Sequence, residues 1–512
     1  MYRKGLLYSL LALGTCLFYP REATASSDKK PNVILIYADD LGKGLLSVYG
    51  QKQFTTPNID ALIKNGVDFS YAYGGAVCSY ARASLFTGYH NCTQGKWRIT
   101  SGGAYIKDKT ENIPSSENFI EGNTIYLPEA DLYLPQVFKN AGYVTGQIGK
   151  LGIGNTSTRT QMVRYGWDYF YGDLDFDRSK GYYPPFLFEN ETFVTIEGNT
   201  KTNCGVNEEQ ESEFAYSKRW NMEGKEVYAP DLFIEKTIEF LTTFKGSPFF
   251  LMFSPQLPHG PVSVQAIHPE VANNDALTPI EKEYATMVKL LDEQVGKIMA
   301  ELRSLGLEEN TIVIFTSDNG HENHYIQPER FERPPRNIYT KEYFDESYSK
   351  YYSEIGGDIF DGNAGMAGLK RNNLEGGIHV PLAFYWKGHL KSGVCNEVVA
   401  NYDFLPTIAE MLNVSIKTKK SGASFLQSLM KGKKLSKNHF VIVGSYFGPA
   451  LIMNDGWKLR YSNRKKNYEL YNLREDPKEK YDVSLRFPKK TEDLKKIMLE
   501  QCNGSIENGI HN

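Results

Sequence analysis

The sequence predicts an α/β fold, with a large mixed, mainly parallel sheet sandwiched by helices and a small C-terminal α+β subdomain. Short buried-strand patterns alternate with amphipathic helices over most of the chain, and closely spaced short strands follow near its end. The 512 residues are 41% hydrophobic and 23% charged, a globular composition that argues against wholesale disorder. The formal net charge of −3 gives no bulk attraction to nucleic acid or anionic lipid, so we expect neither as a partner.

The chain begins with a pattern typical of an export signal. Two basic residues precede an apolar run over residues 5–18, and Ala23-Thr24-Ala25 fits a cleavage site. We therefore expect residues 1–25 to be a signal peptide and the mature protein to be periplasmic or secreted. The stretch ending at Cys16 resembles a lipoprotein signal, but Thr15 is bulky for the residue before a lipidated cysteine. No other stretch approaches the ~20 apolar residues of a membrane span.

Five apolar runs rich in branched and aromatic residues are predicted to be buried strands. They cover residues 32–38, 143–148, 248–254, 311–316 and 380–386. Helices lie between them: Thr56 and Pro57 begin one that ends at Gly66, and the capping box from Thr278 to Glu281 begins a long one. This alternation favours a mainly parallel sheet with helices on both faces.

Each of the first four predicted strands is followed by polar side chains. In chain order these are Asp39 and Asp40, then Lys150, then His259, then Asp318 and Asn319. We expect them to meet, because open α/β sheets build their sites at the carboxyl ends of the strands. The three aspartates and the asparagine offer only oxygen donors, which suit calcium or magnesium rather than zinc or copper. Taken alone, Asp-Asn-Gly is typical of a tight turn.

The most informative segment is residues 78–88, which read Cys-Ser-Tyr-Ala-Arg-Ala-Ser-Leu-Phe-Thr-Gly. If a helix starts near Ser79, Cys78 lies at its positive N-terminal end, where an anion or a nucleophile is stabilised. Arg82 follows four residues later and therefore lies near the same helix face. A cysteine beside an arginine is more often structural than catalytic, so the residues that follow decide the interpretation.

With this segment the chain resembles the formylglycine-dependent sulfatases of the alkaline phosphatase superfamily. Their signature, Cys-x-Pro-Ser-Arg-x-x-Leu-x-Thr-Gly, is matched here at its Cys, Arg, Leu, Thr and Gly positions. Further matches follow in the family's order along nearly the whole mature chain. They cover residues 31–35, 39–40, 57–62, 149–154, 258–261, 317–320, 370–381, 403–407, 457–459 and 469–471.

The resemblance implies a specific mechanism. A maturation enzyme would oxidise Cys78 to formylglycine, and one hydroxyl of its hydrate would attack the sulfur of a sulfate ester. A divalent cation and fixed positive groups would stabilise the charge on the sulfate, and His259 would deliver the proton to the leaving oxygen. The implied catalytic residues are Cys78, Arg82, Lys150, His259 and Lys370. The implied metal ligands are Asp39, Asp40, Cys78, Asp318 and Asn319, with Ca²⁺ favoured over Mg²⁺.

Two positions depart from the family pattern, and both concern the chemistry. Tyr80 replaces the proline two residues after the cysteine, in the short segment that the maturation enzymes read, and Ala81 replaces the following serine. Gly152 replaces the histidine of the Gly-Lys-Trp-His segment, which contacts the hydrated formylglycine in the family. His321, directly after the Asp-Asn-Gly segment, is a candidate to compensate for it.

We therefore expect an exported sulfatase that hydrolyses sulfate esters, with a sulfated carbohydrate as its substrate. One alternative is a catalytically impaired relative that binds sulfated glycan. The other is a phosphoester or phosphonate hydrolase of the same superfamily, although the single-metal pattern argues against two-metal phosphatases. Two aromatic-rich insertions, at 93–126 and 156–228, are long enough to shape a substrate pocket. Their candidates for sugar contact are Trp97, Arg98, Tyr182 and Tyr183.

The domain boundary is predicted after Leu412, where residues 413–437 are polar and rich in lysine. The catalytic α/β domain would then cover residues 26–412 and the C-terminal subdomain residues 413–512. Within the subdomain, residues 440–446, 450–453 and 457–461 are predicted strands, and residues 491–500 a closing helix.

Overall fold

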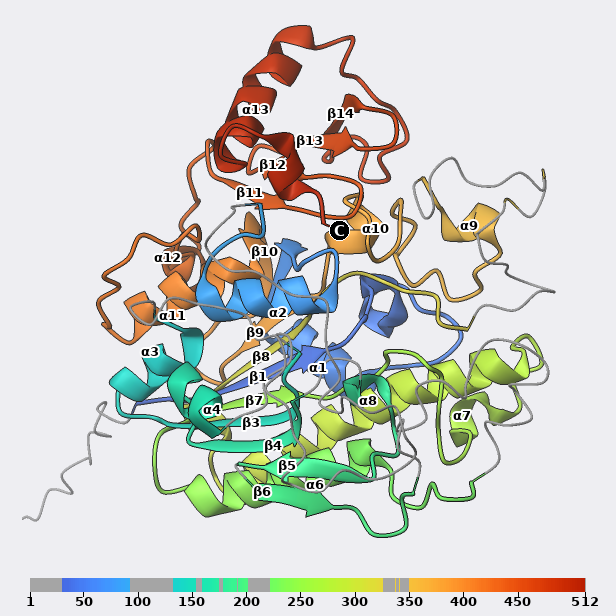
Figure 1. Cartoon of the computed structure of the whole chain (residues 1–512), viewed down its shortest axis with the longest axis vertical. Helices are drawn as coiled ribbons and strands as arrows, with labels where there is room; N and C mark the ends of the chain where they lie inside the picture. The colour runs from blue at the N-terminus through green and yellow to red at the C-terminus, as the bar shows by residue number, and fades with distance from the viewer. Residues whose placement is uncertain are drawn as a thin grey trace, which may run out of the picture.

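The computed structural model describes residues 30–92, 132–152, 159–174, 178–190, 192–200, 222–325, 337, 340 and 350–511. Within them, one sheet has ten strands and a second, antiparallel sheet has four (Figure 1). The predicted mainly parallel α/β fold with a small second sheet is thereby confirmed. The predicted signal peptide, Trp97 and Arg98 lie outside the described residues. No helix in the described part of the chain is both long enough and apolar enough to cross a membrane.

The large sheet has the strand order β10-β2-β9-β8-β1-β7-β3-β4-β5-β6. Its centre, β8-β1-β7-β3, is parallel and consists of the four strands whose ends were predicted to carry polar residues. The fifth predicted strand, β9, is shorter than expected and antiparallel to both of its neighbours. The strands are β1 (Asn32–Ala38), β2 (Val67–Tyr73), β3 (Val144–Lys150), β4 (Tyr169–Asp173), β5 (Phe186–Glu189), β6 (Thr192–Thr195), β7 (Phe249–Ser254), β8 (Thr311–Ser317), β9 (Leu382–Tyr385) and β10 (Gly393–Ala400).

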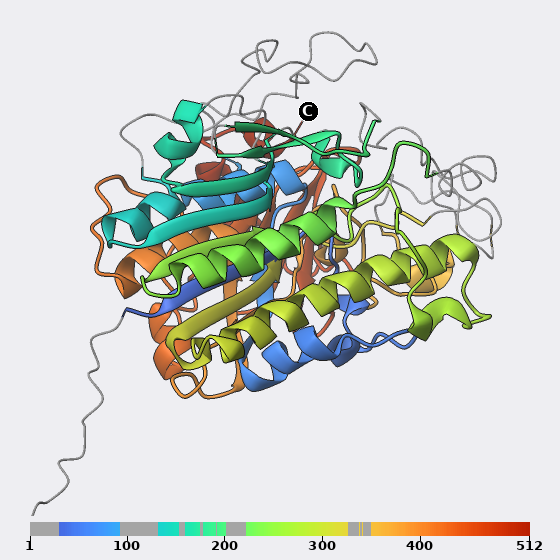
Figure 2. The ribbon, with the colours of Figure 1, turned by 90° about the horizontal axis from the view of Figure 1, so that it is seen from below.

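Helices cover both faces of this sheet. Figure 2 shows α6 and α8 side by side across the strands, and with α1 and α7 they form one layer. The other layer contains α2, α3, α4, α11 and α12. The helices are α1 (Pro57–Asn65), α2 (Cys78–Thr87), α3 (Leu134–Asn140), α4 (Arg159–Tyr165), α6 (Ala229–Phe244), α7 (Pro269–Ala272), α8 (Pro279–Ser304), α9 (Ser353–Gly356), α10 (Glu375–Ile378), α11 (Phe404–Met411), α12 (Leu426–Lys431) and α13 (Pro488–Gln501). Short 3-10 turns are η1 (Lys43–Leu45), η2 (Ser47–Tyr49), η3 (Arg178–Lys180), η4 (Glu308–Asn310), η5 (Asn401–Asp403) and η6 (Ile506–Gly509).

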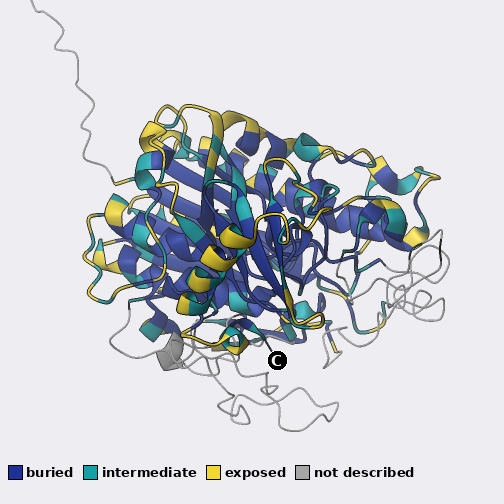
Figure 3. Ribbon diagram, turned by 90° about the horizontal axis from the view of Figure 1, so that it is seen from above, coloured by how far each residue is buried: buried dark blue, intermediate teal, exposed yellow. Residues whose placement is uncertain are grey.

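The two helical layers explain why the central strands are continuously apolar. Along β1, Ile34 and Ile36 face one core, and Val33 and Leu35 face the other. Every residue of β1 is buried, and Figure 3 shows the central strands as buried throughout. A strand that is covered on both faces has no polar side to reveal an alternating pattern. The capping box predicted for the long helix is also present, because Glu281 accepts a hydrogen bond from the Thr278 amide at 2.8 Å.

The insertion over residues 156–228 is partly sheet rather than loop, since β4, β5 and β6 extend one edge. Tyr182 and Tyr183 are each only 1% exposed, so the prediction that they contact sugar is wrong for this arrangement. The Tyr182 ring stacks on Tyr228, and its hydroxyl donates to the carbonyl of His259 at 2.6 Å. These tyrosines therefore attach the insertion to the core, and Tyr182 also supports the backbone at His259.

The small sheet is fully antiparallel, with the order β11-β12-β13-β14. Its strands are β11 (Phe440–Val443), β12 (Ala450–Met453), β13 (Trp457–Ser462) and β14 (Asn467–Asn472). The predicted strands and closing helix are present, although α13 begins earlier, at Pro488, and β14 was not among the predicted strands. Leu494 and Met498 of α13 pack against this sheet, which therefore has a core of its own.

Candidate active site

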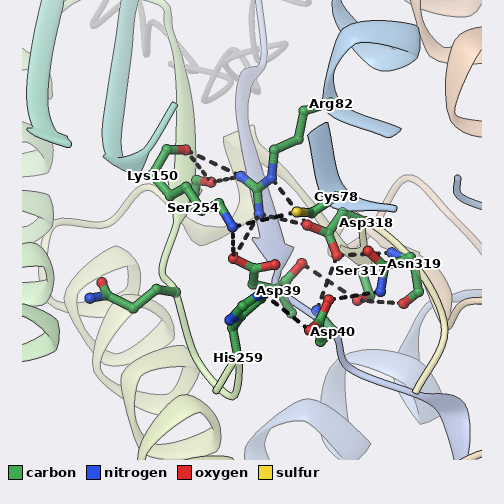
Figure 4. Close-up of polar contacts among 12 residues, drawn as sticks. Asp39, Asp40, Cys78, Arg82, Lys150, Ser254, His259, Ser317, Asp318 and Asn319 are labelled. Carbon is green, nitrogen blue, oxygen red and sulfur yellow. Dashed lines mark hydrogen bonds and ion pairs between the residues drawn. The ribbon is translucent and has the colours of Figure 1, made fainter. Parts of the chain in front are cut away.

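The polar residues predicted to meet at the carboxyl edge of the sheet do meet (Figure 4). Because β8, β1, β7 and β3 are adjacent and parallel, their ends lie along one edge. The helix α2 and the loop before α10 bring in the remaining residues. All nine residues predicted for catalysis or metal binding are buried: Asp39, Asp40, Cys78, Arg82, Lys150, His259, Asp318, Asn319 and Lys370.

Cys78 occupies the first position of α2, one residue earlier than predicted. Val77 before it has extended backbone geometry, so the helix begins at the cysteine itself. Its side chain is therefore close to the positive end of the helix dipole. The Lys150 ammonium lies 3.7 Å from the Cys78 sulfur and adds a second positive charge. This environment favours an anion or an anionic transition state next to residue 78.

Arg82 is fully buried, and its guanidinium is held on all sides. Its Nε and Nη2 atoms donate to the Asp318 carboxylate at 3.1 and 2.9 Å. Its Nη1 atom donates to the Lys150 carbonyl at 3.2 Å and to the Ser254 hydroxyl at 2.5 Å. Ser254, the last residue of β7, was not predicted to take part. Five donors in a fixed fork leave the arginine little freedom, so its charge is kept in place near Cys78.

Each aspartate after β1 has its own lysine. The Lys150 ammonium lies 2.5 Å from Asp39 Oδ2, and the Lys370 ammonium lies 2.6 and 2.7 Å from the two Asp40 oxygens. Burial alone would raise the pKa of Asp39, but the positive charges around it, chiefly those of Lys150 and Arg82, together keep that pKa below its usual value. Asp318 differs, because burial and the charge of Asp39 raise its pKa to about 7. The negative charges of Asp39 and Asp318 therefore repel each other, although Arg82 and Lys150 lie beside them.

The residues fit a hard divalent cation. Asp39, Asp40 and Asp318 bring carboxylate oxygens within 4.8 Å of one another. In addition, Asp39 Oδ1 and Asn319 Oδ1 are buried oxygens without a hydrogen-bond partner among the described residues. Buried acceptors without a partner are costly, and a cation would satisfy both while relieving the repulsion between the carboxylates. An all-oxygen set of this kind suits calcium or magnesium.

His259 lies beside Asp40, with its Nε2 atom 3.4 Å from Asp40 Oδ2. Its Nδ1 atom contacts the Gly260 carbonyl, so the neutral ring carries its proton on Nδ1. Its Nε2 atom is then an acceptor and lies 3.2 Å from the Lys370 ammonium. Burial lowers the pKa of His259 well below its usual value, which keeps the ring neutral at rest. The pair of Lys370 and His259 therefore has its exchangeable proton on the lysine.

A second histidine, His324, was missed from the sequence. Its Nε2 atom lies 2.8 Å from Asp40 Oδ2, and its ring centroid is 5.0 Å from that of His259. His321 is the histidine that the sequence pattern indicated, but its side chain lies elsewhere. His321 is fully buried, contacts the Tyr325 hydroxyl at 2.9 Å and lies 3.7 Å from Asp358. Only the position of His324 shortly after Asp-Asn-Gly could have signalled it.

Comparison with known proteins identifies the family. The family model described as Sulfatase matches residues 31–414, which is well over half of the chain. The chain belongs to the Sulfatase family. A second family model, described as N-sulphoglucosamine sulphohydrolase, C-terminal, matches residues 367–505. Since sulfatases are sulfuric ester hydrolases, the expectation of an enzyme of this class is confirmed.

This sulfatase is similar to several named relatives. It is 25% identical to the N-acetylgalactosamine-6-O-sulfatase of Bacteroides thetaiotaomicron, over 96% of this chain and 97% of that protein. It is 27% identical to human arylsulfatase D, over 80% of this chain and 68% of that protein. Among solved structures, Ps i-CgsB in complex with a neocarrahexaose has 24% identity, 93% coverage of each chain and a TM-score of 0.68. These likenesses support the shared fold along nearly the whole chain.

In this sulfatase Tyr80 has a structural partner at the far end of the chain. Its ring stacks on His511, with the ring centroids 3.8 Å apart and the planes 7° from parallel. Ile510 forms a bridge with Ser445 after β11, and the His511 ring contacts Asn91 at 2.9 Å. The C-terminal segment is thereby fixed against the first turn of α2. Tyr80, which replaces the family's proline, is one side of that contact.

Proposed function

We propose that this chain is an exported sulfatase that hydrolyses sulfate esters of a sulfated carbohydrate. It would use formylglycine made from Cys78 and a bound divalent cation, Ca²⁺ in preference to Mg²⁺. One observation carries the proposal: Cys78 lies at the N-terminus of α2, with the Lys150 ammonium 3.7 Å from its sulfur and three carboxylates clustered nearby. The ligand set would be Asp39, Asp40, residue 78 as formylglycine, Asp318 and Asn319.

The fixed cations give the site its preference for a sulfate ester. A sulfate monoester carries its negative charge on non-bridging oxygens, and Arg82, Lys150 and Lys370 present positive charge around residue 78. All three are buried, and charges act more strongly where water is excluded. Formylglycine, once formed, would supply a hydroxyl nucleophile, and the cation would draw charge from the ester oxygens. Arg82 and Lys150 would hold the sulfate in line for the attack.

The leaving oxygen needs a proton, and the Lys370–His259 pair can supply it. Burial lowers the pKa of Lys370, but the negative groups around it, with Asp40 the strongest, together hold that pKa above its usual value, so the lysine is protonated at rest. In our proposal the proton moves from Lys370 Nζ to His259 Nε2, which are 3.2 Å apart, and from there to the leaving oxygen. His259 would thus act as the proton donor expected from the sequence, with Lys370 restoring its proton.

The relatives support a carbohydrate as substrate. Named relatives include N-acetylgalactosamine-6-sulfatases from Rattus norvegicus and Bacteroides thetaiotaomicron. Structural neighbours include a protein in complex with a carrageenan oligosaccharide and one in complex with D-glucosamine-2-N,6-O-disulfate. The signal-peptide pattern of residues 1–25 supports export, and export would place the enzyme where sulfated polysaccharides occur. A screen of sulfated saccharides would identify the sugar and the position of the sulfate.

The deciding experiment is the mass of the proteolytic peptide containing Cys78, from protein made in its native host. Formylglycine shows the loss of sulfur and two hydrogens and the gain of one oxygen relative to cysteine. The converted protein should then release sulfate from at least one member of a panel of sulfated saccharides. Cys78→Ala is the matched control and should release none.

Two other results would overturn the proposal. If Cys78 remains a thiol in all of the protein, the site has no nucleophile, and a sulfated-glycan-binding protein becomes the better conclusion. The sequence feature behind that alternative is Tyr80 in place of the proline. If converted protein instead releases phosphate from phosphate esters and no sulfate from sulfate esters, the chain is a phosphoester hydrolase. A matched panel of sulfate, phosphate and phosphonate esters of the same alcohols separates these cases.

A further inference from the structure

A second cationic region lies away from the acidic cluster. A groove of about 1010 Å³ runs beside β10, the edge strand of the large sheet. It reaches Val67 and Gly393, the first residues of β2 and β10, which run in the same direction as the central strands. The groove therefore extends from the amino-terminal edge of the sheet, whereas the site around Cys78 lies at the carboxyl edge. Figure 1 places β10 between α12 and the small sheet.

Positive side chains dominate the lining. They are Lys391, Lys431, Lys433, Lys434, Lys437 and Arg474, and we call the cavity that they line the lysine groove. All six are exposed, and within the described part of the chain none of the five lysines is paired with a carboxylate. The lining has only two acidic residues. For a chain with a formal net charge of −3, this is a pronounced local excess of positive charge.

The two acidic residues are already engaged. Glu397 accepts hydrogen bonds from the Leu435 amide and the Asn454 side chain, both at 2.8 Å. Asp455 lies 3.6 Å from the ammonium of Lys490, which is outside the groove lining. Among the described residues, neither carboxylate forms an ion pair with a lysine of the groove. The groove thus presents exposed ammonium groups that have no ion-pair partner in the described ranges of the chain.

The backbone that carries these lysines is fixed in place. Gly432 ends α12 with a left-handed φ of 62°, and its amide donates to the Ser428 carbonyl at 3.0 Å. The Ser428 hydroxyl donates to the Lys433 carbonyl at 2.6 Å. The Glu397 side chain holds Leu435, and the Asn454 side chain reaches the Ser436 carbonyl at 3.3 Å. The lysines thus project from a preorganised loop, which lowers the entropic cost of binding a ligand across them.

We propose that the lysine groove binds a segment of sulfated polysaccharide, separately from the site around Cys78. The choice of ligand rests on the proposed function. Lysine ammonium groups are compact charges on flexible stems, so they can follow sulfate groups spaced along a polymer without demanding one sugar. A long polymer bound at the groove would be tethered to the enzyme, which would raise the effective concentration of its other segments at the site on the opposite edge of the sheet. An extended, exposed row of lysines suits a polyanion better than a small anion.

The test measures binding in the absence of hydrolysis. The probes are heparin and chondroitin sulfate, each with its chemically desulfated form, and the protein is the full mature chain with Cys78→Ala. The groove variant adds Lys431→Gln, Lys433→Gln and Lys434→Gln. The control variant adds Lys245→Gln, Lys297→Gln and Lys496→Gln, three exposed lysines outside the groove that change the net charge equally. We expect about tenfold weaker binding and a shallower salt dependence for the groove variant, with the control unchanged.

Several results would overturn the proposal. The first is an equal loss of affinity in the groove variant and in the control variant. The second is no loss of affinity in the groove variant. The third is that the desulfated polymers bind as tightly as the sulfated ones. Preferential binding to phosphatidylglycerol vesicles would mean that the groove is a membrane contact instead. A second arm keeps Cys78 and measures sulfate release from sulfated monosaccharides, which the groove substitutions should leave unchanged. If neither the natural protein nor the variants release sulfate in that arm, the proposed function fails. The binding measurements would still show whether the lysine groove binds sulfated polysaccharide.

Discussion

Arg82 lies so close to Gly152 that a Cβ atom on residue 152 would be 2.5 Å from the Arg82 Cδ atom. Gly152 also has a left-handed backbone, with φ of 68°, which side-chain-bearing residues rarely adopt. The position where the family carries a histidine is therefore occupied here by the arginine itself. The absence of that histidine and the tight packing of Arg82 therefore depend on each other, because residue 152 has no space for a side chain while Arg82 keeps this position.

Restoring the family's histidine should consequently harm this enzyme. We expect Gly152→His to displace Arg82 from Asp318, to reduce kcat/KM by at least about tenfold and to cost more than about 1 kcal/mol of unfolding free energy. Gly152→Ala is the matched control, since it brings the same clash and strain without an imidazole. Both variants should unfold at lower urea concentrations and release sulfate more slowly than the natural protein. A Gly152→His enzyme more active than the natural one would show that Arg82 can move and that the histidine is missed.

Removing the cation should reduce both stability and activity. Without it, the Asp39, Asp40 and Asp318 carboxylates repel one another, and two buried oxygens have no hydrogen-bond partner within the described part of the chain. At a Ca²⁺ concentration of about 100 times Kd, binding would add about 2.7 kcal/mol to the free energy of unfolding. We expect EGTA to lower Tm and abolish sulfate release, and Ca²⁺ to restore both more fully than Mg²⁺. In Asp39→Asn, Tm should respond little to Ca²⁺, and an unchanged response would place the cation elsewhere.

The site could be predicted from the sequence wherever a residue follows a recognisable strand. Asp39, His259 and Asp318 each come soon after a continuous apolar run, and parallel neighbours bring such ends to one edge. His324 and Ser254 could not be predicted in this way. The position of His324 depends on how the chain after β8 returns over Asp40, which no local pattern records, and Ser254 is itself the last residue of a buried strand.

The burial of Tyr182 was missed for a related reason. An aromatic residue in a long insertion suits a sugar-binding surface and a core contact equally well. Only the placement of β5 and α6 around it shows that Tyr182 packs on Tyr228. Sequence periodicity reports which face of an element is apolar, but an insertion without a repeating pattern carries no such record.

His324 should matter through Asp40. Its Nε2 atom lies 2.8 Å from the Asp40 carboxylate, a predicted cation ligand, so we expect it to orient that carboxylate. Loss of such a supporting group typically lowers metal affinity or activity by about 10–100-fold. We expect His324→Ala to shift the Ca²⁺ concentration for half-maximal activity upward by about this factor, and His324→Gln, which retains a donor, to shift it less. The same Ca²⁺ dependence in all three proteins would show that His324 has no such role.

Tyr80 should limit the conversion of Cys78 to formylglycine. Tyr80 is the third residue of α2, so its amide needs no partner within the helix and a proline there removes no helical hydrogen bond. We expect Tyr80→Pro to raise the converted fraction of the Cys78 peptide when the family's maturation enzyme is supplied. The loss of the stack on His511 should cost about 1 kcal/mol. Tyr80→Phe keeps the stack without the proline and should show the natural level of conversion; an equal rise in both variants would contradict this reading.

The contact of the C-terminal segment with α2 should weaken in acid. Burial lowers the pKa of His511 to about 3, from an ordinary value of 6.5. The unfolded chain therefore binds more protons than the folded chain below pH 6.5, so this contribution to stability is complete above pH 6.5 and is lost as the pH falls toward 3. Between pH 7 and pH 5 the loss amounts to about 2 kcal/mol. The free energy of unfolding from urea titrations should therefore decrease less between pH 7 and pH 5 in His511→Asn than in the natural protein, by this amount.

The same decrease contains a further acid-sensitive contribution from His90, because burial lowers the pKa of that residue to about 4. That contribution should persist in His511→Asn and disappear in His90→Asn, so an identical pH effect in the natural protein and in His511→Asn would mean that His511 is not buried against Tyr80 in solution.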